Sequence, residues 1–389
     1  MIELGLTSTQ RREYEATLIR SHQMRVTVQV LDNSHGVIST VNHTLMDGQV
    51  DVTTPSRSGD DVEVGRTLML TLLDPGQSLA LDSSSPADGA LYLDRMIRVI
   101  YSVRCSFGWV DVPVFTGPVV KVDRDGWMVN VEAHGKERFA LDDAWTLDGP
   151  YTGYKTSVIR ALLSDAGEIL ARMNIPSSSS KVKDPISVGR QDKRWVAAWK
   201  VSASLDRVLF YDGRGIVQCR SLSNAVMATF GAKHILADPQ ISYSSTDTHN
   251  AVRVTGGKAS KSKTPVFSVA TAPSWHPLSA SKLAVNGKPR YLPLFEENDN
   301  YKTTTACRAR ANRLLDLSLD QATDTTVEVV PRPDLEPWDL VAIERPLFRV
   351  TTRPKAFTLP LVQRAGTGTP MTIGFTKDVR RPTRAVGKK

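Results

Sequence analysis

The sequence contains few cysteines and no long apolar run. Its three cysteines, Cys105, Cys219 and Cys307, are far apart, and none lies in a C-x-x-C spacing. This pattern supports neither a disulfide framework nor a zinc site, so we expect buried or half-buried free thiols in a protein made in a reducing cytoplasm. No apolar stretch approaches the ~20 residues of a membrane span, and the first residues contain no secretory signal. We therefore expect no stable membrane insertion.

Motifs of the common enzyme classes are also missing. The seven histidines include no H-x-x-x-H or H-E-x-x-H pair, and the chain has neither a G-x-S-x-G elbow nor a P-loop. Gly213-x-Gly215 and Gly366-x-Gly368 lack the third glycine and the following helix of a nucleotide-binding loop, so both are expected to be turns. We predict no catalytic residue, no metal, no cofactor and no enzymatic activity.

A few residue groups allow both a functional and a structural interpretation, and for each we expect the structural one. Carboxylate clusters are either catalytic pairs or exposed loop charges. A histidine beside an aspartate is either a base with its orienting acid or a loop residue at the start of a strand. Two tryptophans four positions apart on a helix are either a sugar platform or core. The groups are Asp60-Asp61 with Glu63, Asp142-Asp143, Asp247 with His249, and Trp195 with Trp199.

The formal net charge of +8 is concentrated at the end of the chain. In residues 377–389, six basic side chains face only Asp378, while Pro382 and Gly387 oppose helix and strand. We expect a basic C-terminal arm that contacts a protein partner; DNA is the alternative, although no aromatic residue is interleaved to stack on bases. The candidate contact residues are Arg380, Arg381, Arg384, Lys388 and Lys389.

At 389 residues the chain exceeds the ~250–300 residues at which single cores stop growing, so two to four domains are expected. Residues 1–143 begin with a short helix at Leu6 to Arg20. Alternating strands follow, from Met24 to Asp32 onward, separated by Gly, Pro and Asp turns. This spacing predicts an antiparallel N-terminal β-barrel or sandwich domain.

The middle region, residues 144–236, changes character and predicts an α+β domain. Lys155 to Leu170 has helical periodicity, and Arg194 to Leu209 contains a second helix leading into a strand. Asp212-Gly213-Arg214-Gly215 is a tight turn into the next strand. Residues 237–376 return to β and predict a second barrel-like domain with an inserted helical segment at about 275–322.

The inserted segment contains an amphipathic helix, Thr304 to Leu319. Cys307, Ala311, Leu314, Leu315 and Ser318 share one face, and Thr303 or Thr304 can cap the first turn. A β-branched strand, Thr325 to Val330, leads to Pro331, Pro333 and Pro337, which remove backbone donors. A further strand is expected at Trp338 to Glu344.

This order of helix, strand, proline-rich turn and strand resembles the tail-hub proteins of long-tailed bacteriophages, which include the N-terminal part of tail-associated lysins. The carrying pattern is A-x-A-x-x-L…V-x-V-x-x-x-P-x-L-x-P-x-D-x-V-x-I, with N-A-V-R-V-T-G-G at Asn250 to Gly257. The order of the N-terminal hairpin and strands adds to it. The family's turn usually reads P-G-D, whereas this chain has Pro337-Trp338-Asp339, and tryptophan disfavours the positive φ that glycine permits.

The resemblance implies a mainly β fold with α+β insertions, in which two antiparallel β-barrel-like domains are joined by smaller α+β domains. It implies a structural virion protein, made in the host cytoplasm, that forms a homotrimeric hub at the tail tip. As partners it implies a distal tail protein, a tape-measure protein and a central tip or fibre protein, with transient passage of phage DNA. The alternatives are a host-surface carbohydrate-binding module or a lysin with an unrecognised active site.

Overall fold

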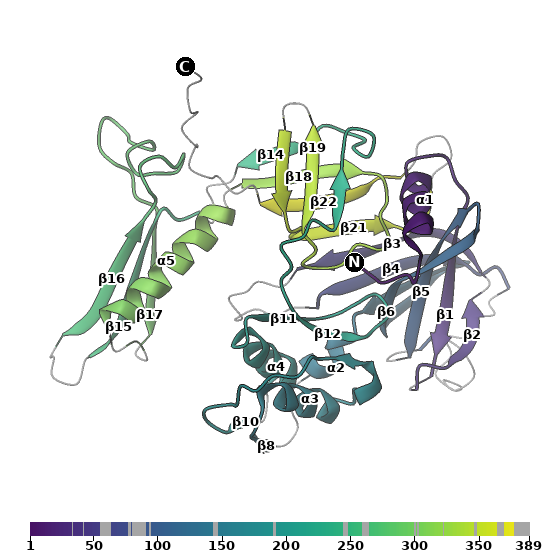
Figure 1. The fold of residues 1–389 in the computed structure, drawn as a ribbon, viewed down its shortest axis with the longest axis horizontal. Helices are drawn as coiled ribbons and strands as arrows, with labels where there is room; N and C mark the ends of the chain where they lie inside the picture. Colours follow the sequence, from purple (N-terminus) through teal and green to yellow (C-terminus); the bar gives the residue numbers. More distant parts are fainter. Residues whose placement is uncertain are drawn as a thin grey trace. The chain divides into compact units, whose positions relative to one another are not determined.

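The computed structural model describes residues 1–376, except 33, 42, 55–63, 77–78, 80–90, 93–94, 143–146, 190–191, 244–247, 259–263, 299–300, 302, 322, 346–347 and 364–368. The chain forms two compact units (Figure 1). Unit 1 contains Met1–Asp238 and Val327–Ile373. Unit 2 contains Pro239–Thr326 and the residues from Gly374 onward. Unit 2 is thus largely an insertion into unit 1. It begins at Pro239, before strand β14, and its two other boundaries fall inside strands β18 and β22.

Unit 1 begins with helix α1, Ser8–Leu18, in which Thr7 and Gln10 form a reciprocal capping box. Tyr14 and Leu18 are the buried side chains of this helix. Seven strands with alternating burial follow, as expected for a sheet with one face on a core. They are β1 (Met24–Leu31), β2 (Val37–Val41), β3 (Thr44–Thr53), β4 (Arg66–Leu73), β5 (Met96–Cys105), β6 (Gly108–Asp125) and β7 (Met128–His134).

Strand β6 joins two sets of antiparallel strands. Its first part, Gly108 to Pro118, pairs with β5, and its last part, Val119 to Asp125, pairs with β7. Gly117 lies at the changeover, where an added Cβ would be 1.9 Å from the carbonyl oxygen of His134. Only glycine fits so close an approach of two backbones. The two sets of strands are therefore joined through β6 into one continuous sheet.

The α+β part of unit 1 packs helices on small sheets (Figure 1). Its core includes Ile159, Leu162, Trp195, Leu209 and Cys219. The helices are α2 (Glu137–Leu141), α3 (Lys155–Asp165), the 3-10 turn η1 (Leu170–Arg172) and α4 (Arg194–Ala203). The strands are β8 (Asp148–Tyr151), β9 (Met173–Asn174), β10 (Ile186–Val188), β11 (Arg207–Tyr211), β12 (Val217–Ser221) and β13 (Ala228–Phe230).

The chain returns to unit 1 after the insertion and completes its sheets. The returning strands are β18 (Thr323–Val329), β19 (Val341–Arg345), β20 (Phe348–Thr352), β21 (Ala356–Pro360) and β22 (Met371–Thr376). Strand β21 pairs antiparallel with β3, and β19 pairs in parallel with β13. The large sheet runs β18-β22-β21-β3-β4-β7-β6-β5-β1-β2 within this unit. The predicted mainly β fold with α+β parts is confirmed, and the strands of the described residues form no closed barrel.

Unit 2 is a three-stranded sheet covered on one face by a long helix. The sheet order is β16-β15-β17, where β15 is Ala251–Lys258, β16 is Pro265–Thr271 and β17 is Pro293–Asn298. Helix α5, Thr304–Gln321, lies along this sheet (Figure 1). A further strand, β14 (Gln240–Tyr243), pairs with the first residues of β18. The strand β17 falls in a segment whose local sequence indicates irregular structure.

The helix face predicted in unit 2 is confirmed. Cys307, Ala311 and Leu315 are buried against Val252 and Val254 of the sheet. Leu314 packs at the edge of the same cluster, and Ser318 is also buried. The backbone amide of Ala306 donates to the side chain of Thr303, which is one of the two caps expected. All three cysteines of the chain are buried and free, as predicted.

Two expected elements are shorter than the sequence indicated. The helix expected to reach Leu170 ends at Asp165, because Gly167 follows with a φ of +92° and directs the chain out of the helix. The strand expected at Trp338 to Glu344 begins only at Val341. Its first residues instead complete the turn described next.

Candidate functional site

The most unusual local feature of unit 1 is a run of buried charges between β18 and β19. We call residues Pro331–Asp339 the proline turn. Arg332, Asp334, Glu336 and Asp339 of this turn are at most 6% exposed. Charged side chains are rarely buried to this degree unless they are paired, so the turn must find its counter-ions elsewhere in the fold. Those counter-ions come from three distant parts of the chain.

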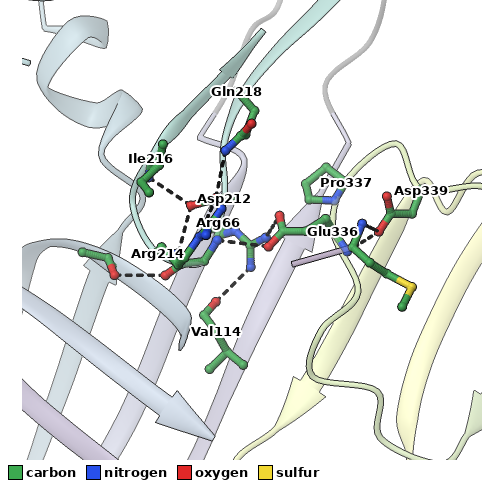
Figure 2. Close-up of polar contacts among 12 residues, drawn as sticks. Arg66, Val114, Asp212, Arg214, Ile216, Gln218, Glu336, Pro337 and Asp339 are labelled. Atoms are coloured by element: carbon green, nitrogen blue, oxygen red, sulfur yellow. Dashed lines mark hydrogen bonds and ion pairs between the residues drawn. The ribbon is translucent and has the colours of Figure 1, made fainter. Parts of the chain in front are cut away.

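Glu336 joins the proline turn to the first sheet and to the α+β part. Arg66, at the start of β4, donates from its guanidinium to Glu336 and to the carbonyl oxygen of Val114 (Figure 2). The backbone amide of Gly213 donates to the other carboxylate oxygen of Glu336 at 3.1 Å. One carboxylate thus ties together segments more than a hundred residues apart. The hydrogen bonds of Glu336 therefore join three parts of unit 1: β4, the β11–β12 turn and the proline turn.

The β11–β12 turn that presents the Gly213 amide is itself fixed by Asp212. The carboxylate of Asp212 accepts hydrogen bonds from the backbone amides of Arg214 and Ile216, both at 3.0 Å (Figure 2). It also accepts from the side chains of Arg214 and Gln218. An added Cβ on Gly213 would lie 2.2 Å from the carbonyl oxygen of Pro113, so only glycine fits. The turn is preorganised to meet Glu336.

Asp334 and Arg332 bind the proline turn to helix α1. Arg11 contacts Asp334 at 2.5 Å, and the guanidinium of Arg332 lies 2.7 Å from Glu15 and 3.2 Å from Asp334. The net shift in the pKa of Arg332 is upward. Burial alone would lower this pKa, but the carboxylates of Asp334 and Glu15 raise it by more. The ion pairs therefore keep this buried guanidinium charged.

Asp339 makes the third link. Its carboxylate contacts the amino group of Met1 at 2.5 Å and the guanidinium of Arg220 on β12 at 2.9 Å. It also accepts a hydrogen bond from the backbone amide of Glu336 at 2.9 Å, which closes the turn on itself. The proline turn thus contacts α1, β4 and the β11–β12 hairpin through charged groups.

Trp338 stands where the tail-hub sequence pattern has glycine, and it adopts a backbone conformation that glycine favours. Its φ is +69°, a left-handed value that bulky side chains rarely adopt. Its side chain is 8% exposed and packs on Val208 and Phe210 of β11, with Leu222 at the edge. The burial of the large indole offsets the backbone strain, which costs on the order of 1–3 kcal/mol. The turn keeps its shape although it lacks glycine.

The network holds distant segments of unit 1 together. Its carboxylates accept hydrogen bonds from described donors, and its core is closed to solvent. Burial raises the pKa of Glu336 to about 7 even though Arg66 opposes that shift. No group of three or more His, Cys, Asp or Glu side chains in the described ranges could hold a metal ion. Among these residues, no helix is long and apolar enough to span a membrane.

The candidate residues singled out by their sequence patterns have structural roles wherever the structure describes them. Trp195 is 1% exposed and stacks on Tyr211, and Trp199 belongs to the same core, so the core interpretation is confirmed. Exposed Asp142 pairs with Arg138 at 2.8 Å. The backbone amide of His249 donates to Ser318. The other candidates lie outside the described residues: Asp60, Asp61, Glu63, Asp143, Asp247, Gly366, Gly368 and the arm residues Arg380, Arg381, Arg384, Lys388 and Lys389.

The residues of the network do not stand out in the sequence as a functional motif. A signal is nevertheless present: D-L-E-P-W-D at Asp334 to Asp339 places three carboxylates in a segment that is otherwise apolar and proline-rich. A segment with that composition and a buried environment requires cationic partners. The sequence does not show which of the many arginines supply them.

The fold described above is that of known tail proteins. A tail protein from Neisseria meningitidis MC58 superposes with a TM-score of 0.59 at 11% identity, covering 92% of this chain and 97% of that one. The 43 kDa tail protein of prophage MuSo2 from Shewanella oneidensis superposes with a TM-score of 0.60 at 11% identity, covering 90% and 98%. No protein-family model and no curated protein sequence matches this chain. The resemblance to phage tail proteins is therefore confirmed at the level of the fold.

Proposed function

We propose that this chain is a structural protein of a phage tail, and that it forms the hub of the tail tip. The observation that carries the proposal is the fold, which matches two tail proteins over at least nine-tenths of all chains compared. A likeness confined to one motif would indicate only a shared building block. A likeness over both units of the chain instead favours a shared role in the tail.

The proposed hub is a homotrimer in the virion that surrounds the channel for DNA ejection. It would link a distal tail ring and a tape-measure protein to a central tip or fibre. The buried charge network supports such a role, because it fixes the parts of unit 1 to one another. We also propose that the basic residues Arg380, Arg381, Arg384, Lys388 and Lys389 contact a neighbouring tail protein.

The uncovered face of the unit 2 sheet supports self-association. Helix α5 covers one face, and the alternate residues Phe267, Val269 and Phe295 on the other face are 51%, 52% and 67% exposed. Arg253 lies over the ring of Phe267 at 4.5 Å on this face, and Glu297 is exposed on β17. Apolar surface that also carries both charge signs suits contact with another protein, and in a threefold ring the contact is with a different surface of the neighbouring copy.

The test is the oligomeric state of the purified full chain. Light scattering after gel filtration should give three times the 42.8 kDa mass of one chain, and cryo-electron microscopy should show rings with threefold symmetry. Phe295→Ser should weaken the assembly, whereas Arg308→Ser on the exposed side of α5 should not. A chain that stays monomeric at high concentration, or that clears purified peptidoglycan faster than a heat-inactivated control, would contradict the proposal.

A further inference from the structure

A cavity of about 380 Å³ in unit 1 has an apolar wall beside a lining of ionisable side chains. It opens between the β1–β2 turn, β5, helix α2 and the segment after α3, and its volume is in the ~300–1,000 Å³ range of ligand pockets. One wall is apolar and is formed by Met96, Phe139, Ala140 and Ala166. The polar lining consists of His35, Lys136, Glu168 and Tyr211.

The buried ionisable groups of this pocket include one acid and one base that pair with each other. Lys136 and Glu168 are 4% and 8% exposed, and the ammonium group lies 2.5 Å from the carboxylate. The ammonium group also lies 5.4 Å from the ring of Tyr211. The charges of Lys136 and Glu168 cancel, so the net charge of the pocket depends on the other ionisable groups around them.

Two arginines beside the pocket form no ion pair with a carboxylate among the described residues. Arg172 donates only to the backbone carbonyl oxygens of Arg214 and Gly215. Arg98 lies two residues from Met96 on the same face of β5, and its guanidinium makes no hydrogen bond or ion pair with the described part of the chain. Asp212, another nearby acid, is engaged by Arg214. The pocket therefore has an excess of positive charge.

His35 is the fourth basic group and is held in an unusual conformation. Its φ is +69°, and Asp32 fixes the turn by accepting hydrogen bonds from the amides of Ser34 and Gly36 at 2.8 Å. Both ring nitrogens of His35 are buried, and neither has a hydrogen-bond partner of ordinary geometry. A buried polar ring without partners costs free energy, and the cost disappears when a ligand supplies an acceptor.

The pKa values of two basic groups at this pocket, His35 and Arg98, are both lowered. Burial lowers the pKa of His35 to about 4, and Lys136, Arg172 and Arg98 contribute to the lowering. Burial and the neighbouring Arg172 also lower the pKa of Arg98. Each shift disfavours a further positive charge, as expected where cations gather without counter-ions.

We propose that this pocket binds a small organic anion, in which a carboxylate or phosphate group is carried on a compact apolar body. The anionic group lies among His35, Arg98, Lys136 and Arg172, and the apolar body lies on the wall that includes Met96 and Phe139. Arginine suits such a group because its planar guanidinium can bind two oxygens at once. The source of the anion is either a free small molecule or the terminal carboxylate of another protein chain.

Calorimetric titration of the full chain with benzoate, phenyl phosphate and uncharged benzyl alcohol tests the proposal. We expect both anions to bind and benzyl alcohol not to bind. A peptide that ends in phenylalanine, with a free or an amidated terminus, distinguishes the two sources. Tighter binding of the free peptide than of benzoate assigns the pocket to a chain terminus, and the reverse order assigns it to a free ligand. Absence of heat with every anion, binding of inorganic phosphate alone, or equal binding of benzyl alcohol would overturn the proposal.

Two variants locate the site. Arg98→Gln removes a cation that forms no ion pair with the described part of the fold, and we expect the affinity for benzoate to fall about tenfold, as for the loss of one charge-assisted hydrogen bond. Arg104→Gln is the matched control, because Arg104 lies on the same strand and is exposed. Equal affinities of Arg98→Gln and Arg104→Gln for benzoate would overturn the placement of the anionic group beside Arg98.

The pH dependence provides a second readout. An anion should raise the pKa of His35, so the affinity for benzoate, which stays ionised in this range, should increase as the pH falls from about 7 to about 5. The other charged groups around His35 are Asp32 on its own turn, Lys136 and Glu168 in the pocket lining, and Arg98 and Arg172 beside the lining. Protonation of Asp32 or Glu168 can contribute to this increase. His35→Gln isolates the contribution of the histidine and should reduce the increase. An unchanged pH profile in this variant would overturn the role of His35.

Discussion

Arg66 and Glu336 lie 270 positions apart in the chain, yet they form an ion pair in which both side chains are at most 4% exposed. The pair joins the start of β4 to the proline turn, and Gly213 of the α+β part completes it. Removal of one charge from a buried pair leaves the other without a counter-ion in a medium of low polarity. The stability of unit 1 should therefore depend strongly on this contact.

We expect Glu336→Gln to lower the free energy of unfolding by about 1–3 kcal/mol, because the amide group replaces one acceptor oxygen by a donor and leaves a buried donor of Arg66 or Gly213 without a partner. The double variant Arg66→Met with Glu336→Leu should be more stable than Glu336→Gln alone, since it removes both charges. Denaturant unfolding followed by fluorescence measures these values. Arg25→Met is the control: its pair with Asp111 is about half exposed, so we expect a change of ~0–1 kcal/mol. A Glu336→Gln effect no larger than the control would contradict the structural role of the pair.

Trp338→Gly should destabilise the protein even though it removes backbone strain. The strain at a φ of +69° costs on the order of 1–3 kcal/mol, whereas loss of a buried tryptophan costs about 3–5 kcal/mol. We expect a net loss of about 2 kcal/mol, within a range of about 0–4, measured as a shift of the urea midpoint. Asn286→Gly is the matched control, because Asn286 has a φ of +50° and an exposed side chain. That control should leave the midpoint unchanged or raise it.

Leu315→Ala should destabilise unit 2 by about 2–5 kcal/mol, because Leu315 is 5% exposed and packs on the sheet under α5. Leu314→Ala should have a smaller effect, since Leu314 is only partly buried. Arg308→Ala on the exposed side of the helix serves as the control. Thermal unfolding of the full chain with a reporter in unit 2 measures the order of the three effects. Equal effects of Leu315→Ala and Arg308→Ala would refute the packing of this face.

The pH dependence of stability should contain two opposing contributions. Burial raises the pKa of Glu336 to about 7, so the folded state binds more protons than the unfolded state between about pH 4.5 and 7. This contribution to stability falls as the pH rises through that window. The pKa of His35 is lowered to about 4, so its contribution rises with pH between about 4 and 6.5.

Glu336→Gln should therefore make the slope of stability against pH more positive, and His35→Gln should make it less positive. The free energy of unfolding in urea at several pH values across these windows gives both slopes. The sign of each change is the quantity to compare, because the absolute stability of each variant also contains its lost contacts. Slopes that change in the same direction would contradict at least one of the two assignments.

Local patterns predicted the elements of this fold better than its contacts. The strand expected at Met24 to Asp32 is β1, Met24–Leu31, because its alternation of side chains matches a half-buried strand. The face of α5 was also predicted from its periodicity. Strand β17 was missed because Pro293 begins it within a segment rich in proline and asparagine; its parallel pairing with β15 supplies what the local sequence does not.

The central network could not be predicted for a different reason. The partners of Glu336 lie at Arg66 and Gly213, and nothing in one sequence identifies which arginine meets a given carboxylate across such distances. Trp338 is a similar case. The sequence pattern places it where glycine is usual, but only its packing on Val208 and Phe210 explains how tryptophan is accommodated there.

The late position of the proline turn has a consequence for the order in which the chain is completed during synthesis. Arg66 leaves the ribosome long before Glu336, so the interior of unit 1 is without its anion while residues 67–335 are made. Helix α5 and the sheet beneath it lie within one continuous stretch, from β15 to Gln321, and can form their core before then. Of the two units, the inserted one is thus the first that can complete its core, and unit 1 is complete only when residues 327–373 have been made.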